Sequence, residues 1–347
     1  MQERIEWKWI EAFRHVFEMC HVGQGDPVAV LCETQSRDIN VQLAVLALQA
    51  IGASPYVLKL PTPRLEAPVP VRSTGSTNIV KGLRPVVDAL KSAAMVVDLS
   101  VEGMMHAEET PEILQGGSRI LYISNEHPEA LERLRPSEQL IDRVLKGRAM
   151  MQAAQTLTVT SAAGSNLTVE MQGARVGGNL GVVREPGTMA TWAGGICSCF
   201  PARGSVNGRL VLDTGDVNCT FKRYVERPVS LTVEDDFVTA VEGEGVDADL
   251  MRSYFDAWGD REAYGASHLG WGMNPGARWD SLTMYDKRDT NCIEQRAFAG
   301  NFLYSTGANP FADRYTLGHF DLPMRNCTIE IDGQAVAIDG VLQGELA

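Results

Sequence analysis

Over its first 135 residues the chain alternates short runs that are apolar throughout with longer stretches that have helical spacing. The apolar runs are PVAVLCE (27–33), PYVLKL (55–60), AMVVDLS (94–100) and RILYIS (119–124). A strand that is apolar on both faces must be covered on both faces, and helices between parallel strands supply that cover. This alternation predicts an α/β domain over residues 1–135, with a doubly wound parallel sheet.

The stretches between these strands carry the helical signal. Residues 4–20 place Ile5, Ile10 and Phe13 near the spacing of an amphipathic helix, and residues 39–53 are apolar enough for a buried one. The turn after the first strand, CETQSRD, lacks the glycines that let a backbone approach a pyrophosphate, and nothing matches a P-loop. A nucleotide-binding function is therefore not expected.

Beyond a predicted helix at 137–155 the pattern changes. Short segments of alternating polarity, such as TLTVTS, NLTVEM, VSLTVED and FVTAVEG, are separated by Gly, Asn and Asp. This pattern is typical of antiparallel, turn-rich structure, and one clear helix interrupts it at 247–260. We therefore expect a C-terminal α+β domain over residues 136–347 that is mainly antiparallel and β-rich.

Charge and composition exclude several functions. A net charge of −13 disfavours binding to nucleic acid or to anionic membranes, both of which need a basic surface. No apolar run approaches the ~20 residues that span a bilayer, and MQERIEWKWIEAF lacks a secretory core, so a cytoplasmic location is expected. Seven scattered cysteines without a C-x-x-C pair are expected to be reduced and mostly buried, although CSC at 197–199 could bind a metal as thiolates.

Candidate chemistry begins with the segment LGHFDLPMRN. In an extended chain, His319 and Asp321 project from the same face, while Phe320 packs behind them. This spacing alone also fits an ordinary strand, because His106 and His127 are followed by a glutamate at the same spacing. A metal site requires a third ligand.

The segment YGASHLGWGMNPGARW offers that ligand in His268. Glycines at 265, 270 and 272 flank it, where the backbone can approach another group closely, although a hydrogen-bonded core histidine is the alternative. With His319 and Asp321 it gives two imidazoles and one carboxylate. Such a set leaves positions open for a substrate anion and O2 and is the ligand set of non-haem Fe(II) oxygenases.

The segments YGASHLGWGMNP, NFLYSTGAN and HFDLPMRNC, with GRLVLDTGDV and RAFAGNF, closely resemble the 2,5-dihydroxypyridine 5,6-dioxygenase family. These bacterial ring-opening enzymes share the fold of the M29 (aminopeptidase T-like) metallopeptidases. The resemblance covers nearly the whole chain and is strongest over 262–331. It implies one Fe(II) ion held by His268, His319 and Asp321 in the C-terminal domain. It also implies extradiol-type cleavage of a hydroxylated N-heteroaromatic ring by O2, and a homo-oligomer for which a hexamer is the expected size.

The same resemblance implies roles near the metal. His106, in VEGMMHAEE, matches the family's substrate-activating histidine and could remove a proton from a ring hydroxyl, with a surface histidine as the alternative. Ser305 could donate a hydrogen bond to substrate or oxygen, or it could cap a turn. Trp192 and Trp271 are expected to form part of an apolar wall that excludes water.

Departures from the family pattern concern the substrate. Asn179 and Thr191 stand where an acid and a second histidine are expected, and Glu185 lies close enough to restore an acidic partner. If these side chains line the pocket, they would favour another hydroxypyridine, such as a 3,4-isomer, over the 2,5-isomer. An unpaired buried polar group costs about 1–3 kcal/mol, so the preference should be measurable.

Two other functions compete with the dioxygenase. An M29-type metallo-aminopeptidase needs two metals and therefore more acidic ligands, yet Ile196 occupies the place of one such acid in GGICSC. A non-catalytic binding protein that kept the fold is the other alternative.

Overall fold

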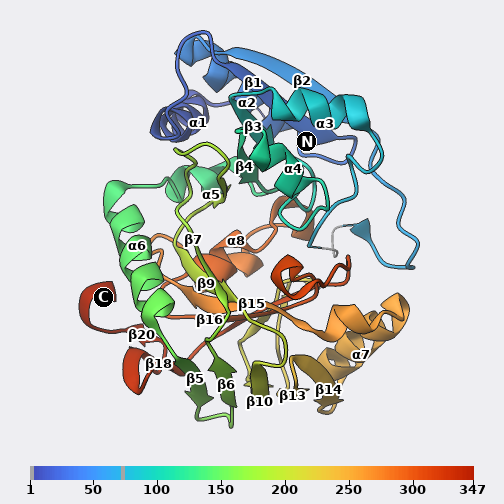
Figure 1. Cartoon of the computed structure of the whole chain (residues 1–347), viewed down its shortest axis with the longest axis vertical. Helices are drawn as coiled ribbons and strands as arrows, with labels where there is room; N and C mark the ends of the chain where they lie inside the picture. Colours follow the sequence, from blue (N-terminus) through green and yellow to red (C-terminus); the bar gives the residue numbers. More distant parts are fainter. Residues whose placement is uncertain (1–3, 72–74) are drawn as a thin grey trace.

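The computed structural model describes residues 4–71 and 75–347. The N-terminal sheet and its helices lie at one end of the molecule, and the β-rich part lies at the other (Figure 1). Among the described residues, no helix is both long and apolar enough to cross a membrane. All seven cysteines are free and buried, in agreement with the expectation from sequence.

The N-terminal part is the predicted doubly wound α/β unit. Its sheet has the order β2-β1-β3-β4-β8, and every neighbouring pair is parallel. The strands are β1 (Pro27–Glu33), β2 (Ser54–Leu60), β3 (Met95–Asp98), β4 (Arg119–Ile123) and β8 (Met189–Trp192). The helices are α1 (Trp7–Met19), α2 (Asp38–Ile51), α3 (Arg84–Lys91), α4 (Thr110–Gln115) and α5 (Pro128–Arg133).

Both faces of this sheet are covered, as wholly apolar strands require. Val28 and Val30 of β1 belong to the same buried cluster as the inner faces of α1 and α2. Ala29 and Leu31, which alternate with them, pack instead in a cluster with α3 and α4. The alternation of side chains along a strand thus places one helical layer on each face.

One strand of this sheet comes from beyond residue 135. Strand β8 pairs with β4 in parallel, with Ile120 opposite Met189 and Ile123 opposite Trp192. The chain therefore leaves the first domain at α6 (Glu138–Ala153), forms three strands, and returns to the parallel sheet. A boundary at residue 135 separates β8 in sequence from the sheet to which it belongs.

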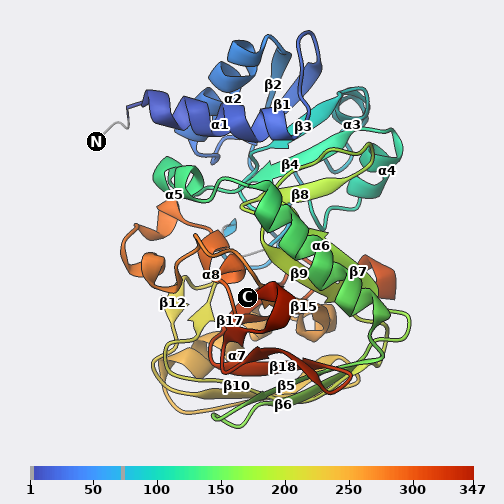
Figure 2. The ribbon, with the colours of Figure 1, turned by 90° about the vertical axis from the view of Figure 1, so that its left-hand side faces the viewer.

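The C-terminal part contains two antiparallel sheets that share one hydrophobic core (Figure 2). The larger has the order β14-β13-β10-β6-β5-β18-β19-β20, and the smaller has the order β17-β16-β15-β9-β7. The larger consists of β5 (Thr156–Ser161), β6 (Asn166–Glu170), β10 (Val206–Leu212), β13 (Val229–Glu234), β14 (Phe237–Glu242), β18 (Cys327–Ile331), β19 (Gln334–Ile338) and β20 (Val341–Leu342). The smaller consists of β7 (Arg175–Asn179), β9 (Ile196–Phe200), β15 (Ala266–Gly272), β16 (Phe302–Thr306) and β17 (Phe320–Met324).

Shorter elements complete this part. A two-stranded ribbon joins β11 (Val217–Asn218) to β12 (Arg223–Tyr224), and the helices are α7 (Val246–Trp258) and α8 (Ile293–Ala297). Short 3-10 helices lie at Arg261–Tyr264, Trp279–Thr283, Lys287–Asp289, Pro310–Ala312 and Gly344–Leu346. The predicted strands at 156–161, 166–171, 229–235 and 237–243 and the helix at 247–260 are confirmed to within about two residues, the usual uncertainty of element ends.

Buried polar contacts join the two parts. Glu126, just after β4, accepts hydrogen bonds from the backbone N–H groups of Asn291 (2.7 Å) and Ile293 (3.0 Å) at the start of α8. An ion pair between Arg133 and Glu294 (2.7 Å) lies beside them. These contacts fix the carboxyl edge of the parallel sheet against the smaller antiparallel sheet.

Candidate metal centre and active site

Neighbouring strands of the smaller sheet align three polar side chains. Asp321 of β17 lies directly opposite Ser305 of β16. The pairing of β15 with β16 shifts between Ala266 and Leu269, an irregularity that contains His268. The Ser305 hydroxyl donates a hydrogen bond to Asp321 Oδ1, and its oxygen lies 3.2 Å from His268 Nε2. The strand register, rather than sequence proximity, brings these groups together.

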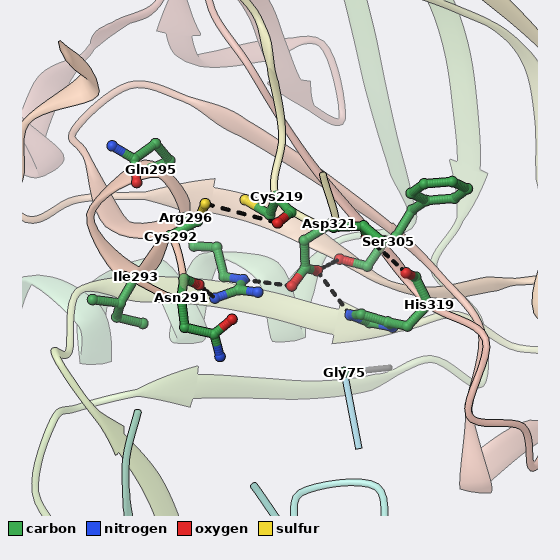
Figure 3. Close-up of polar contacts among 12 residues, drawn as sticks. Gly75, Cys219, Asn291, Cys292, Ile293, Gln295, Arg296, Ser305, His319 and Asp321 are labelled. Carbon is green, nitrogen blue, oxygen red and sulfur yellow. Dashed lines mark hydrogen bonds and ion pairs between the residues drawn. The ribbon is translucent and has the colours of Figure 1, made fainter. Parts of the chain in front are cut away.

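His319, immediately before β17, points to the same carboxylate (Figure 3). Its Nε2 lies 3.2 Å from Asp321 Oδ1, and His268 Nε2 lies 3.6 Å from the same oxygen. Phe320, between them in sequence, is completely buried on the other face, where its ring packs against Tyr254 at 4.6 Å between centroids. The structure thus gives the H-x-D segment the extended, same-face arrangement expected for it.

An arginine side chain forms an ion pair with the second carboxylate oxygen of Asp321. Arg296 of α8 pairs through Nε with Oδ2 and donates from Nη1 to the carbonyl of Asn291 (Figure 3). Burial alone would raise the pKa of Asp321, but Arg296 foremost, and then His319, hold that pKa well below its usual range. Asp321 is therefore ionised, with Oδ2 held by Arg296 and Oδ1 facing the two imidazoles.

The neighbouring imidazole is neutral. Burial lowers the pKa of His268 to about 4, although the charge of Asp321 partly opposes this effect. A neutral imidazole is the form that donates a lone pair to a metal ion. Ser267 and Ser305 contact the two ring nitrogens of His268, each at 3.2 Å, and hold the ring in its plane.

The donor set fits a metal ion, and its separations are compatible with one. Within the described ranges, no group of three or more His, Cys, Asp or Glu side chains already surrounds a common metal position. However, two donors about 2.1 Å from an octahedral ion and at right angles to each other are about 3 Å apart. The distances of 3.2 and 3.6 Å at Asp321 Oδ1 are close to this value, so small side-chain shifts would admit an ion.

A third histidine faces this cluster from the N-terminal part. His106 lies on the loop 99–109 that joins β3 to α4, at the carboxyl edge of the parallel sheet. Its half-buried ring lies 5.9 Å from the His268 ring and 5.7 Å from the His319 ring between centroids. Burial, and then the imidazoles of His319 and His268, lower the pKa of His106 well below its usual range, so the ring is neutral at pH 7 and can accept a proton.

The structure does not bring Asn179 or Thr191 to this cluster. Asn179 is opposite Ile196, which is opposite Gly272, whereas His268 lies four residues back along β15. Four residues of strand span about 13 Å. The Asn179 side chain instead accepts hydrogen bonds from the Gly181 and Thr191 N–H groups and donates to the Ala193 carbonyl, which fixes the path between β7 and β8. The expectation that these residues select the substrate finds no support in their placement.

The other predicted pocket residues also lie apart from the cluster. Glu185 is exposed on the turn before β8. Trp192 is completely buried, packs against Phe13 at 4.8 Å between centroids and donates to the Leu134 carbonyl, because β8 belongs to the core of the parallel sheet. Trp271 is completely buried in the core of the C-terminal sheets. Neither tryptophan has surface with which to touch a ligand, so both have packing roles.

Several residues of the site escaped sequence reasoning. Arg296 lies within RAFAGNF, but nothing in that segment shows that it reaches Asp321. Phe200, at the end of β9, places its ring 5.6 Å from His268 and supplies apolar wall. Glu102, four residues before His106, is buried, and Gly75 lies against the His319 ring. The proximity of Glu102 to His106 in VEGMMH was the only signal for it.

Comparison with known proteins is consistent with this arrangement. The family model for 2,5-dihydroxypyridine 5,6-dioxygenase (NicX) matches residues 8–344. The 2,5-dihydroxypyridine 5,6-dioxygenase of Pseudomonas putida KT2440 is 35% identical over 335 residues, covering 95% of this chain and 94% of the relative.

Solved structures give the same result. The structure of 2,5-dihydroxypyridine dioxygenase from Pseudomonas putida KT2440 superposes with a TM-score of 0.92 at 34% identity, covering 97% of this chain and 98% of the other. AmpT from Thermus thermophilus superposes with a TM-score of 0.63 at 13% identity, covering 97% and 99%, which shows a shared fold alone. With a full-length family match and a relative above 30% identity, the chain belongs to the 2,5-dihydroxypyridine 5,6-dioxygenase family.

Proposed function

We propose that this chain is a non-haem Fe(II)-dependent, extradiol-type dioxygenase that opens a hydroxylated pyridine ring and inserts both atoms of O2. The substrate class is a dihydroxypyridine, either the 2,5-isomer or a related one. The observation that carries the proposal is the convergence of His268 and His319 on one oxygen of an ionised Asp321, opposite the neutral imidazole of His106. Membership of the family supports the same chemistry. A homo-oligomer of hexameric size is part of the proposal.

His268, His319 and Asp321 would hold the iron. When bound, Fe(II) supplies adjacent positions for the deprotonated substrate and O2 and allows electrons to pass between them. The protein's contribution is to prepare this ligand set. Arg296 keeps Asp321 ionised and holds its Oδ2, while Ser305 bridges Asp321 Oδ1 and His268 Nε2.

His106 would act as the general base. Its low pKa leaves it neutral at pH 7, so its ring nitrogen is free to take the proton of a substrate hydroxyl. Its ring lies within 6 Å of both metal-ligand imidazoles between centroids, so it would lie close to a hydroxyl group bound beside the metal. The Phe200 ring lies 6.1 Å from the His106 ring and 5.6 Å from the His268 ring between centroids, and this apolar side chain would help to exclude water.

The test is O2 uptake by protein reconstituted anaerobically with one Fe(II) per chain. A panel of dihydroxypyridines and dihydroxybenzenes is offered, and the product mass should exceed that of the substrate by both oxygen atoms. Asp321→Asn should abolish both iron retention and O2 uptake. His106→Gln should retain iron but lose turnover by about 10²–10⁴-fold, the usual contribution of a general base. Stoichiometric zinc with no O2 uptake after Fe(II) loading, or release of peptide amides by a two-metal form, would refute the proposal.

A further inference from the structure

The loop 99–109 carries a second ionisable side chain toward the cluster. Glu102 is only 7% exposed, and within the described part of the chain its carboxylate has one hydrogen bond, from the Gly75 N–H to Oε2 at 3.3 Å. Gly75 lies against His319, because a Cβ at this position would overlap the imidazole ring. Glu102 is thus separated from His319 by one backbone unit, and its Oε1 has no partner among the described residues.

The backbone around Glu102 is rigid. Asp98 accepts hydrogen bonds from the N–H groups of Ser100 (3.0 Å) and Met104 (2.7 Å), and Val101 donates one to the carboxylate that ends β1 (2.6 Å). These bonds fix the residues on both sides of Glu102 to the ends of β1 and β3. A carboxylate held in this way is oriented before any ligand arrives.

The charges around Glu102 favour a hydrogen-bond donor as its partner. Burial raises the pKa of Glu102 to about 7, while Lys222 and Arg296 partly oppose this effect. Lys222 donates to the Lys287 carbonyl (2.9 Å), and Arg296 pairs with Asp321, so neither cation forms an ion pair with Glu102 in the described structure. A buried carboxylate without such a partner is stabilised by a ligand that brings its own N–H or O–H group.

We propose that Glu102 binds the substrate by accepting a hydrogen bond from the ring N–H, and that it thereby selects N-heterocyclic over carbocyclic rings. The inference rests on the proposed function. Hydroxypyridines with a 2- or 4-hydroxyl group adopt pyridone tautomers that carry an N–H. In the matching benzene a C–H takes that place and leaves the carboxylate unpaired. His106, on the same loop, would serve the hydroxyl, so the ring nitrogen remains for Glu102.

The test measures anaerobic binding to Fe(II)-loaded protein by calorimetry. Two matched pairs are used: 2,5-dihydroxypyridine with hydroquinone, and 3,4-dihydroxypyridine with catechol. The wild type should bind one pyridine at least about tenfold more tightly than its benzene partner, as expected for a charge-assisted hydrogen bond. Glu102→Ala should abolish that preference, whereas Glu102→Gln, whose amide oxygen still accepts a neutral hydrogen bond, should reduce it at least about threefold. Both variants should change the Kd of the benzene less than about threefold. Iron content should stay at one per chain. Glu108→Gln, an exposed carboxylate on the same loop, is the matched control and should behave as wild type.

Equal losses for pyridine and benzene, or loss of iron from Glu102→Gln, would overturn the inference, the latter by making Glu102 a metal ligand. If Glu102→Ala fails to fold, the near-isosteric Glu102→Gln decides. Wild-type O2 uptake separates the two proposals. If the wild type turns over a pyridine but Glu102→Gln keeps the same preference for pyridine over benzene, the inference about Glu102 is wrong and the proposed function stands. If the wild type binds neither the pyridines nor the benzenes and consumes no O2, both the proposed function and the inference are refuted.

Discussion

The polar contacts of the site converge on the carboxylate of Asp321. Its two oxygens have different neighbours, because Oδ2 is held by Arg296 while Oδ1 faces Ser305 and the two imidazoles. The carboxylate is therefore ionised and oriented at the same time. Without these partners, burial would raise the pKa of the Asp321 carboxyl group until it became neutral. A neutral acid is a poor metal ligand.

Arg296→Gln should leave that buried charge uncompensated. Breaking one side of a buried ion pair costs about 3–5 kcal/mol, and the free energy of unfolding, measured with urea, should fall by about that amount. The double variant Arg296→Gln with Asp321→Asn should recover part of the loss. Arg288→Gln, at a highly exposed position, is the control and should change stability by less than about 0.5 kcal/mol. A similar loss in both arginine variants would contradict the special role of Arg296.

Glu102 should make stability depend on pH in a defined direction. Its folded-state pKa of about 7 lies above the ordinary value of 4.5, so the folded chain holds this proton more tightly than the unfolded chain. Stability contributed by the protonated acid is present below pH 4.5 and is lost as the pH rises to 7, at up to about 1.4 kcal/mol per pH unit. Urea unfolding of iron-free protein at pH 4.5 and pH 8 should therefore show a smaller decline for Glu102→Gln than for wild type. Parallel curves for the two proteins would contradict this expectation.

At the scale of elements, loops at strand ends bring the two parts of the site together. The loop after β3 presents Glu102 and His106, and Gly75, a residue of the N-terminal part, lies against the His319 ring. Gly75 has φ +61° and lies against the imidazole, so both its backbone conformation and its lack of a side chain are used. The position of His319 therefore depends on a segment about 245 residues away in sequence, a separation no local motif reports.

Gly75→Ala should displace His319. We expect iron affinity to fall at least about tenfold, the scale seen when groups that orient a metal ligand are disturbed. Gly82→Ala is a matched control, because Gly82 has a similar φ of +72° but open space where a Cβ would stand. Backbone strain is thus common to both variants, and only the first meets the imidazole. Competition with a chelator measures the affinity, and equal losses in the two variants would show that strain alone is responsible.

At the scale of the whole molecule, the site exists only where the two parts meet. The proposed metal ligands belong to the C-terminal part, whereas His106 and Glu102 belong to the parallel-sheet part. Glu126 links these parts by accepting two backbone N–H bonds from the start of α8, the helix that also carries Arg296. The contact between the two parts and the ion pair that orients Asp321 therefore depend on the same helix, α8.

Glu126→Ala should weaken both. Two buried N–H groups would lose their acceptor, at about 1–3 kcal/mol each, and α8 would lose its anchor. We expect a lower unfolding midpoint and weaker binding of the hydroxypyridine, while Glu129→Ala, an exposed neighbour on α5, should leave both unchanged. Thermal unfolding and anaerobic calorimetry measure the two effects. Lower stability with unchanged ligand affinity would show that the interface does not support the site.

The sequence by itself determined what depends on local pattern. Apolar runs alternating with helices predicted the parallel sheet, alternating polarity predicted the antiparallel strands, and the i, i+2 spacing placed His319 and Asp321 on one face. Each of these follows from the geometry of a single element, because side-chain direction repeats with its period. The glycine-flanked segment offered His268 as a third ligand, and family resemblance supported that role and added His106, because no spacing connects either residue to that pair.

Only the tertiary structure decided what depends on register and on long-range contact. Asn179 and Thr191 were expected in the pocket, but the pairing of β7 with β9 and β15 puts Asn179 at the opposite end of the sheet. Trp192 was expected in a wall, but β8 returns to the parallel sheet and buries it. Register and strand order are set by the packing of residues far apart in the chain, and shifting a strand by one residue moves its side chains to the other face. Short segments do not report such choices, so the contacts of Arg296 with Asp321, of Gly75 with His319 and of Glu102 with Gly75 are seen only in the folded chain.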